Sequence, residues 1–454
     1  MIRTTRREIL KSLGLGVAAL KGMEIGAFAQ VAEQPASGDA KDLKADEASL
    51  LSYFARVTPQ LLRPAEGVLT QPSIAPTLPG KAYSTELWDW DTLWTARGLF
   101  QVARATKDEA FRKQICTHAQ GSLRNFLRYQ SKEGRIPIMI GVKESDLFGS
   151  ADGKHAVANQ AKPVFGQLAL LVADECGSVA WLAEDFDRLL RFYDSWGAKN
   201  LSRVGLYVWS NDVAIGDDND PTTFGRPDDS SANLLLNCLF YRDLSAATEL
   251  ARRLGREADR ARLAAQMRAL GEKIQTLCWD PRDRFYYTVD VQCVDRRAEL
   301  IPSVPRGMDM QWQALPLRIQ MFTGFLPMWC GLATKAQAED LVRLHFANRA
   351  SFHGAYGVRS LSAQEQMYSL AFSSNPSNWL GPVWIIVNYL VWKGLVDYGY
   401  AAEARELAGV TVRMLAADLK QRGSLNEYYH PDTGASLSHA GFLDWNLLVA
   451  EMMG

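Results

Sequence analysis

The hydrophobic and polar positions of the chain repeat mainly with the period of an α-helix. From residue 46 onwards apolar side chains recur three or four positions apart, whereas long stretches of apolar–polar alternation, which indicate strands, are missing. This pattern predicts about a dozen helices, with ends that are good to a few residues. The predicted helices span residues 46–62, 90–105, 108–130, 163–175, 178–196, 231–254, 256–278, 311–332, 335–347, 381–396, 400–422 and 440–453.

Several of these helices pair as helical hairpins. The helix 231–254 is followed at once by the helix 256–278, and only Gly255 separates them. A long run of hairpins either opens into a solenoid or closes into a ring, and the chain has no repeat of fixed period that would indicate a solenoid. About twelve helices make six hairpins. The sequence therefore predicts an all-α fold, an (α/α)6 barrel or six-hairpin toroid, whose inner helices meet at a funnel.

Four long segments interrupt the helical pattern. Residues 131–161, 201–230, 279–310 and 348–380 are rich in Gly, Pro, Asp and Ser, and each is longer than a helix connection requires. Loops of this length in a compact helical domain usually carry function. None of them has the composition of a linker between domains. We therefore predict one catalytic domain over residues 46–454.

Composition and charge narrow the class of partner. The chain has 454 residues, of which 47% are hydrophobic and 22% are charged, and its formal net charge is −1. With no basic run in addition, this balance gives no indication of binding to nucleic acid or to an acidic membrane surface. The 13 tryptophans indicate a carbohydrate or aromatic ligand only weakly, because core packing also uses tryptophan.

The N-terminus resembles an export signal. Residues 5–11 match a twin-arginine motif at nearly every position, a short apolar stretch follows at 13–20, and Ala27-Phe28-Ala29 offers a cleavage site. The apolar stretch is too short to span a bilayer. The alternative is a basic amphipathic helix of the mature protein. We predict a signal peptide at 1–29, a linker at 30–45 and export by the twin-arginine machinery, so that the protein is periplasmic or secreted and free of the membrane after cleavage.

Six cysteines are scattered along the chain without a C-x-x-C spacing. An even number in an exported protein permits disulfides, but twin-arginine substrates fold before export in a reducing compartment. We therefore expect mostly buried thiols. The six are Cys116, Cys176, Cys238, Cys278, Cys293 and Cys330.

Three tryptophans and two aspartates lie within seven residues at the start of the predicted helix 90–105. Asp91 can cap this helix, but capping does not explain the indoles of Trp88, Trp90 and Trp94. A flat indole beside a carboxylate suits a sugar ring, because the C–H face of the sugar stacks on the aromatic ring and its hydroxyls donate to the oxygens. The alternative is an aromatic core cluster at a helix start.

An acidic loop, Ile215 to Pro221, contains Asp217, Asp218 and Asp220. Such a loop is often solvated or binds calcium, although this one does not follow the EF-hand spacing. The functional interpretation is a general acid. A carboxyl group among other carboxylates is harder to ionise, so its pKa rises and it keeps a proton for a leaving group.

Two further motifs begin the last predicted hairpins. Gly381-Pro382 ends a loop and starts a helix, and the flanking Trp379 and Trp384 form either a structural plug or the wall of a sugar subsite. Glu427 precedes the predicted turn 431–434. A glutamate in a loop usually has no special role, but this one lies at the end of a hairpin. Two carboxylates from separate loops over an aromatic funnel are the minimum set for glycosidic hydrolysis.

These four motifs occur in the order found in glycoside hydrolase family 63. The family includes processing α-glucosidases and mannosylglycerate hydrolases and is related to the trehalases, and the resemblance runs from about Leu51 to the C-terminus. It implies an (α/α)6 barrel and hydrolysis with inversion by an Asp acid and a Glu base. Matched by motif, Asp218 would be the acid and Glu427 the base. The residues that would contact the sugar are Trp88, Trp90, Asp91, Gln160, Lys162, Trp379 and Trp384.

Two departures from the family pattern affect this assignment of residue roles by motif. Leu380 stands where the family usually has Arg, which puts a charged contact in doubt. Ala214-Ile215 replaces the usual Ser-Gly before the acidic loop, so Asp217 competes with Asp218 for the role of acid.

The residues and the resemblance together predict an exported inverting α-glycosidase that acts on an α-glucoside or α-mannoside, without a cofactor or a metal. One alternative is a sugar epimerase or polysaccharide lyase on a helical toroid. Those enzymes use His or Tyr bases, and of six histidines only His430 lies in a recognised motif. The other is a non-catalytic sugar-binding protein, which would have lost one of the two carboxylates. The sequence does not indicate the sugar, the linkage, the aglycone or the oligomeric state.

Overall fold

A computed structural model describes residues 40–149, 159–292, 313–371 and 377–453. All of them belong to one compact unit, Pro35–Gly454. The predicted signal peptide lies outside the described residues, as does the predicted linker up to residue 39. The remaining linker residues are helical, because the first described helix begins at Ala40. In the described part of the chain, no helix combines the length and the apolar character needed to cross a membrane.

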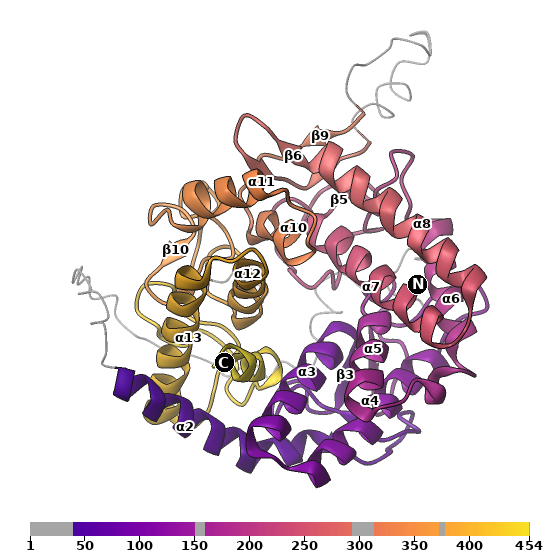
Figure 1. The fold of residues 1–454 in the computed structure, drawn as a ribbon, viewed down its shortest axis with the longest axis horizontal. Helices are drawn as coiled ribbons and strands as arrows, with labels where there is room; N and C mark the ends of the chain where they lie inside the picture. The colour runs from indigo at the N-terminus through magenta and orange to yellow at the C-terminus, as the bar shows by residue number, and fades with distance from the viewer. Residues whose placement is uncertain (1–39, 150–158, 293–312, 372–376, 454) are drawn as a thin grey trace, which may run out of the picture. The chain divides into compact units, whose positions relative to one another are not determined.

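Helices of the described part alternate along the chain between an outer layer and an inner ring (Figure 1). The outer helices are α2 (Ala40–Val57), α4 (Glu109–Arg128), α6 (Phe186–Lys199), α8 (Glu257–Lys273), α11 (Lys335–Asp340) and α13 (Ala401–Arg422). The inner helices are α3 (Asp89–Thr106), α5 (Phe165–Cys176), α7 (Leu234–Arg253), α10 (Leu326–Trp329), α12 (Ile385–Asp397) and α14 (Val449–Met452). Short 3-10 turns precede two inner helices: η4 (Phe322–Phe325) comes before α10, and η6 (Asp444–Leu448) comes before α14. π-Helical turns extend two outer helices: η3 (Ile274–Cys278) follows α8, and η5 (Leu341–Phe346) follows α11.

The inner helices pack in a closed cycle. α3 contacts α5, α5 contacts α7, α7 contacts α10 and α10 contacts α12. α12 then contacts η6 and α14, which return to α3. Hairpins closed in this way form an (α/α)6 barrel, so the predicted fold is confirmed. Burial explains the two layers. Most side chains of α3 are buried on all sides, whereas α8 buries only Leu263, Leu270 and Gly271 and exposes the rest to solvent.

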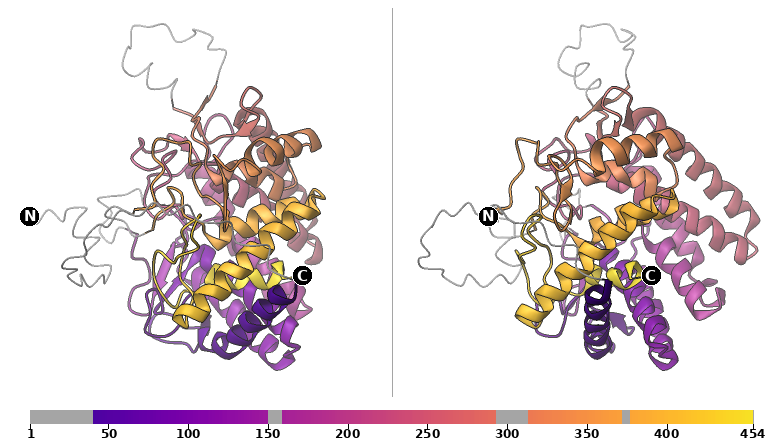
Figure 2. Two further views of the ribbon diagram at one scale, coloured as in Figure 1. Left: turned by 90° about the vertical axis from the view of Figure 1, so that its left-hand side faces the viewer. Right: turned by 60° about the vertical axis from the view of Figure 1, so that its left-hand side comes forward.

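The connections between helices fall into two classes. Turns from an inner helix to the next outer helix are short, such as Lys107-Asp108 between α3 and α4. The connections from an outer to an inner helix are long, and they cover residues 58–88, 129–164, 200–233, 274–325, 347–384 and 423–443. Because successive helices run in opposite directions, all inner helices begin at one end of the barrel. The long loops therefore gather at that end, as the side views show (Figure 2).

Five small antiparallel sheets order these long loops. Strand β3 (Glu86–Trp88) pairs with β4 (Met139–Gly141) directly before α3. Strands β5 (Ser231–Ala232), β8 (Val289–Asp290) and β9 (Leu315–Pro316) form one sheet beside the start of α7. The other pairs are β1 (Leu62–Arg63) with β2 (Ser73–Ile74), β6 (Trp279–Asp280) with β7 (Phe285–Tyr286), and β10 (His353–Gly354) with β11 (Gly357–Val358).

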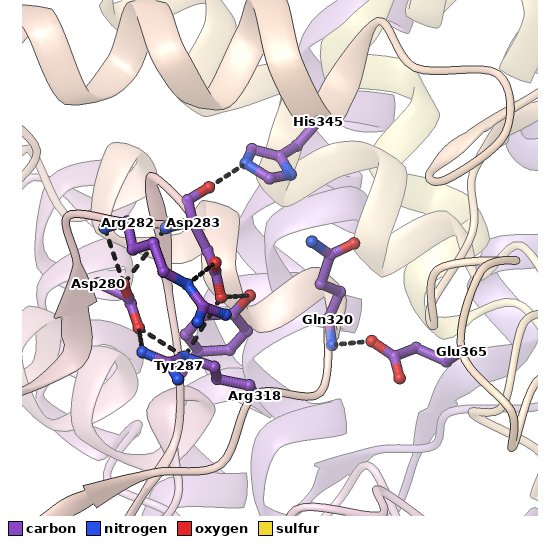
Figure 3. Close-up of polar contacts among 8 residues, drawn as sticks. All are labelled: Asp280, Arg282, Asp283, Tyr287, Arg318, Gln320, His345 and Glu365. Carbon is purple, nitrogen blue, oxygen red and sulfur yellow. Dashed lines mark hydrogen bonds and ion pairs between the residues drawn. The ribbon is translucent and has the colours of Figure 1, made fainter.

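The predicted helix 311–332 is wrong over its first part. Its first two residues lie outside the described chain, strand β9 follows, and helical turns begin only at Phe322. Two contacts hold the segment extended (Figure 3). Arg318 Nε donates to Asp280 Oδ2 at 2.7 Å, and the Gln320 amide donates to Glu365 Oε1 at 2.8 Å. Tertiary contacts thus override the local helical pattern. Three other helical segments start at least four residues later than predicted, α6 at Phe186, α12 at Ile385 and the last segment at Asp444.

The expectation for the cysteines is wrong for one pair. Cys116 of α4 and Cys176 at the end of α5 form a disulfide, with their Cα atoms 6.0 Å apart. Their separation of 60 residues gave no signal, because only the packing of α4 on α5 brings them together. Cys238, Cys278 and Cys330 are buried free thiols, as expected. Cys293 lies outside the described residues.

Candidate active site

The long loops bring the predicted site residues to the N-terminal ends of the inner helices. Asp91 lies in the first turn of α3, Lys162 precedes α5, Asp218 precedes α7 and Glu427 precedes η6. The charges of these groups act on one another across the ring. Asp218 interacts electrostatically with both Lys162 and Glu427. The two carboxylates predicted from separate loops therefore face one site.

Asp218 is a partly exposed carboxyl group with a raised pKa. Burial raises the pKa of Asp218 to about 6, the ammonium group of Lys162 acts in the opposite direction, and the charge of Glu427 adds to the rise. The Ser377 hydroxyl donates a hydrogen bond to Asp218. A carboxyl group with this pKa still carries a proton in weakly acidic solution, as a general acid must.

The neighbouring Asp217 has a different environment. It is 0% exposed, and its hydrogen-bonding partner is the buried carboxylate of Asp220. Asp220 in turn accepts from the Thr222 amide at 2.7 Å and from Asn233 Nδ2 at 3.0 Å. Burial, and then the charge of Asp220, raise the pKa of Asp217 well above its usual range. Asp217 therefore holds its proton inside the protein and orders the loop, while Asp218 faces Glu427.

Glu427 is 4% exposed and is held by its own hairpin. Its Oε2 accepts a hydrogen bond from Ser438 Oγ at 3.1 Å and lies 2.7 Å from His439 Nδ1. Trp445 Nε1 donates to the backbone carbonyl of Glu427 at 3.2 Å. The hydrogen bond to Glu427 raises the pKa of His439 above its usual value. These donors hold the carboxylate of Glu427 at Oε2.

A second pair of carboxyl groups lies on the floor of the site. Asp91 is 8% exposed and accepts a hydrogen bond from Asp444, whose Oδ1 accepts from Thr95 Oγ1 at 2.9 Å. Burial raises the pKa of Asp91 to about 7, and the hydrogen bond from Asp444 acts in the opposite direction. Burial and the charge of Asp91 raise the pKa of Asp444 well above its usual range. Asp444 therefore carries the proton of this pair.

Lys162 connects the acidic loop to the start of α3. Its Nζ lies 3.1 Å from Asp89 Oδ1 and 5.4 Å from the ring centre of Trp90, and it donates to the Ala214 carbonyl at 3.3 Å. Gly216 makes this contact possible. Its φ is +106°, and a Cβ atom there would lie 2.8 Å from Lys162 Cε and 3.2 Å from Trp90 Cζ2. The buried ion pair thus fixes the loop that carries Asp218.

The predicted tryptophans divide into two groups. Trp90, Trp379 and Trp384 are 4%, 1% and 0% exposed. Trp379 stacks on Trp384 with ring centres 4.0 Å apart, and Trp445 packs 5.7 Å from Trp90. This packing favours the aromatic core cluster for these three residues, which support the site from below. Trp88 is partly exposed, and its Nε1 donates to Glu86 Oε2 at 2.7 Å.

Gln160 has both ends of its amide bound within the protein. Its Nε2 donates to Asn200 Oδ1 at 3.1 Å, and its Oε1 accepts from Ser195 Oγ at 3.1 Å. These bonds hold the loop before α5 against α6. Within the described ranges, no group of three or more His, Cys, Asp or Glu side chains is arranged to hold a metal ion.

With this geometry in place, the chain can be compared with known proteins. Residues 85–445 match the model of one family, the mannosylglycerate hydrolase MGH1-like glycoside hydrolase domain. The chain belongs to this family of glycoside hydrolases. The match includes every predicted site residue, from Trp88 to Glu427.

Curated relatives of this MGH1-like domain match over parts of their length. The mannosylglycerate hydrolase of Thermus thermophilus is 32% identical over 148 residues, which are 32% of this chain and 32% of that protein. A probable mannosyl-oligosaccharide glucosidase of Schizosaccharomyces pombe is 25% identical over 309 residues, 61% of this chain and 35% of the relative. The matched regions thus span about a third of the length of these two relatives.

Solved structures show the same fold as the MGH1-like domain. A family 63 mannosylglycerate hydrolase of Thermus thermophilus in complex with glucose has a TM-score of 0.64 at 20% identity, with 89% of this chain and 99% of that chain covered. The neutral trehalase of Saccharomyces cerevisiae has a TM-score of 0.57 at 16% identity, over 85% of this chain and 74% of that chain. The predicted relation to family 63 and the trehalases is confirmed.

Among the residues of the MGH1-like site that were missed from the sequence are Tyr83 and His439. Tyr83 has a left-handed backbone with φ +66° and lies edge-on to Trp88 and to His439, with ring centres 6.2 Å and 5.6 Å away. Burial raises the pKa of Tyr83 well above its usual range, and the charges of Glu427 and Asp218 add to the rise. Nothing around Tyr83 in the sequence indicated this place.

His439, the second missed residue, did have a signal. The predicted turn 431–434 implies a hairpin, and the pairing of Tyr429 with Ser436 places residue 438 opposite Glu427. Residues after the turn therefore belong beside the predicted base. Extending the hairpin register beyond the turn would have found both Ser438 and His439.

Proposed function

We propose that the protein is an exported α-glycosidase that hydrolyses its substrate with inversion, with Asp218 as general acid and Glu427 as general base. The observation that carries this proposal is the pairing of unlike carboxyl groups across one site. Asp218 is kept partly protonated, whereas Glu427 accepts two hydrogen bonds at Oε2. One acid and one base is the division of labour that glycosidic hydrolysis needs.

The reaction follows from these two states. Asp218 donates its proton to the glycosidic oxygen as the bond from this oxygen to the anomeric carbon breaks. Glu427 removes a proton from a water molecule, whose oxygen bonds to the opposite face of the anomeric carbon. The products are a free sugar of inverted configuration and the protonated leaving group. Proton exchange with solvent then returns both carboxyl groups to their starting states.

The relatives direct the choice of substrates to test. Their names refer to a mannosylglycerate hydrolase and a mannosyl-oligosaccharide glucosidase. An α-mannoside or α-glucoside with a small or sugar aglycone is therefore the substrate class that we propose. The Thermus thermophilus mannosylglycerate hydrolase was crystallised in complex with glucose, which adds hexosides to the substrates to test.

The product configuration tests the proposal. We expect an α-linked substrate to release the β-anomer first. The anomeric proton signal in NMR spectra, recorded before mutarotation, identifies this first product. Inversion requires carboxyl groups about 6.5–9.5 Å apart, which leaves room for water, whereas retention requires about 5–5.5 Å. The α-anomer as first product would make Glu427 a nucleophile. Absence of any released sugar across a panel of α-mannosides and α-glucosides would favour the sugar-binding alternative.

Two observations support export. The first is the twin-arginine motif at Arg6 and Arg7. The second is the disulfide between Cys116 and Cys176, because such bonds persist in oxidising compartments such as the periplasm.

We expect Arg6→Lys together with Arg7→Lys to leave the protein in the cytoplasm, because the export machinery reads this pair as an address. Cell fractionation measures the location. Electrophoresis with and without reductant shows whether the disulfide has formed. Arg3→Lys, outside the motif, is the matched control and should not change export. Unchanged periplasmic recovery of the double variant would contradict the signal peptide.

A further inference from the structure

The two carboxylate oxygens of Glu427 have different surroundings. Oε2 accepts from Ser438 and lies 2.7 Å from the Nδ1 of His439, the shorter of the two contacts. Both of these contacts reach Oε2, and neither reaches Oε1. A carboxylate held at one oxygen keeps the other available as an acceptor for a substrate or for water.

We propose that His439 is a positioning residue of the active site, which acts with Ser438 to fix Oε2 of Glu427 and so assigns Oε1 as the atom that takes the proton from water. This inference deepens the proposed function and rests on it. We assign the base to Glu427 and a positioning role to His439, whose Nδ1 contacts the Glu427 carboxylate at 2.7 Å. An acceptor oxygen at this distance requires the proton to reside on Nδ1.

His439 is held in place from several sides. It lies on the strand-like segment that follows the hairpin turn, and its ring centre is 5.6 Å from that of Tyr83, edge-on. Ser438 Oγ lies 3.0 Å from His439 Nδ1, so Ser438 can accept from the ring while it donates to Glu427 Oε2. A three-way contact of this kind fixes the plane of the carboxylate as well as its position.

The interaction also acts on charge. The hydrogen bond to Glu427 favours the protonated imidazole of His439 and raises its pKa. Asp444, Asp218 and Tyr83 also act on Glu427 through their charges. Among these groups around the carboxylate of Glu427, His439 is the one that can gain a positive charge near neutral pH.

A titration tests the contact without any activity. In NMR spectra of the intact protein, the ring of His439, assigned with His439→Asn, should titrate above the ordinary value of about 6.5. In Glu427→Gln this midpoint should fall towards the ordinary value, because the negative partner has gone. His430 provides the internal control, because its Nδ1 accepts from the Asp432 amide instead, and its midpoint should not move. An unshifted His439 midpoint in Glu427→Gln would overturn the proposed pairing.

Kinetics test the positioning role. His439→Leu removes the donor, and we expect kcat to fall about 100-fold with KM little changed, as for misplacement of a reacting group by about 1 Å. The acid limb of kcat/KM should also move, because His439→Leu removes a neighbour of the base that changes charge near neutral pH. His439→Asn should restore most of kcat, since its amide donates from nearly the same place as Nδ1. His430→Leu is the matched control.

These outcomes separate the positioning role from the proposed function. If the protein hydrolyses its substrate and Glu427→Gln is inactive, wild-type kcat and an unmoved acid limb in His439→Leu overturn the positioning role alone. If neither the wild-type protein nor any variant hydrolyses a glycoside, the proposed function fails. The NMR titration of the His439 ring still decides whether His439 pairs with Glu427. Should His439→Leu fail to fold, Ser438→Ala and His439→Asn carry the same comparison of kcat and pH profile.

Discussion

Glu427→Gln is expected to lower kcat on an α-glycoside by about 10⁴-fold, the upper end of the range for a positioned general base. The amide cannot take a proton from water. It keeps the shape of the carboxylate, and its oxygen can still accept from Ser438 at the position of Oε2. KM should therefore change little, and the thermal midpoint of unfolding should stay close to that of the wild type. Steady-state kinetics and a thermal melt measure the two quantities.

The matched control for this variant is Glu406→Gln on the outer helix α13. The Glu406 side chain is 56% exposed on an outer helix, so its loss of charge should leave kcat unchanged. A Glu427→Gln protein with more than about a tenth of wild-type kcat would rule out Glu427 as the base, because general-base catalysis contributes at least about 10²-fold.

Asp218→Asn is expected to slow the enzyme in proportion to the need of the leaving group for a proton. On a sugar or alkyl aglycone the loss should reach about 10²–10⁴-fold, since an amide cannot donate a proton to the departing oxygen. An activated aryl glycoside should be cleaved almost normally, because its leaving group departs as an anion. Rates on the two substrates, compared between variant and wild type, measure this difference.

The pH profile gives the same residue a second test. Burial raises the pKa of Asp218 to about 6, and the acid must be protonated to act. Wild-type kcat/KM should therefore fall tenfold per pH unit above about pH 6, whereas Asp218→Asn should lose this alkaline limb. Asp217→Asn is the control, because its amide can still donate to Asp220 inside the protein. Loss of the limb in Asp217→Asn, with Asp218→Asn unaffected, would exchange the two roles.

The helical period in the sequence was enough to predict the architecture. Most predicted helices lie within a few residues of their observed bounds, since the period reflects the burial of one face, as in α4 and α13. The prediction failed at residues 313–321, where Arg318 and Gln320 are bound by Asp280 and Glu365. Contacts between residues so far apart in sequence leave no trace in a local pattern.

The site was predictable where a motif carried its chemistry. The charges of Asp218 and Glu427 interact across one site, but the sequence did not separate Asp218 from Asp217. That distinction depends on the direction in which each side chain of one tight loop points. Burial of Trp90 and Trp384 likewise depends on Trp445 and Tyr428, which come from another loop. Residues that closure of the ring brings into contact therefore decide which tryptophans are buried, and the sequence alone did not show this.

Closure of the ring by its own ends sets an order of events during synthesis. α3, the first inner helix, packs against η6, and α2 packs against α13, so the beginning of the domain waits for its end. On the ribosome, α2, α4 and α5 can cover part of α3, but the side of α3 that packs on η6 has no cover until Asp444–Leu448 has left the exit tunnel. The nascent chain therefore stays an open arc, exposed to aggregation and in need of chaperones, until translation is complete. A stop codon that removed only the last turns would leave an arc that never closes.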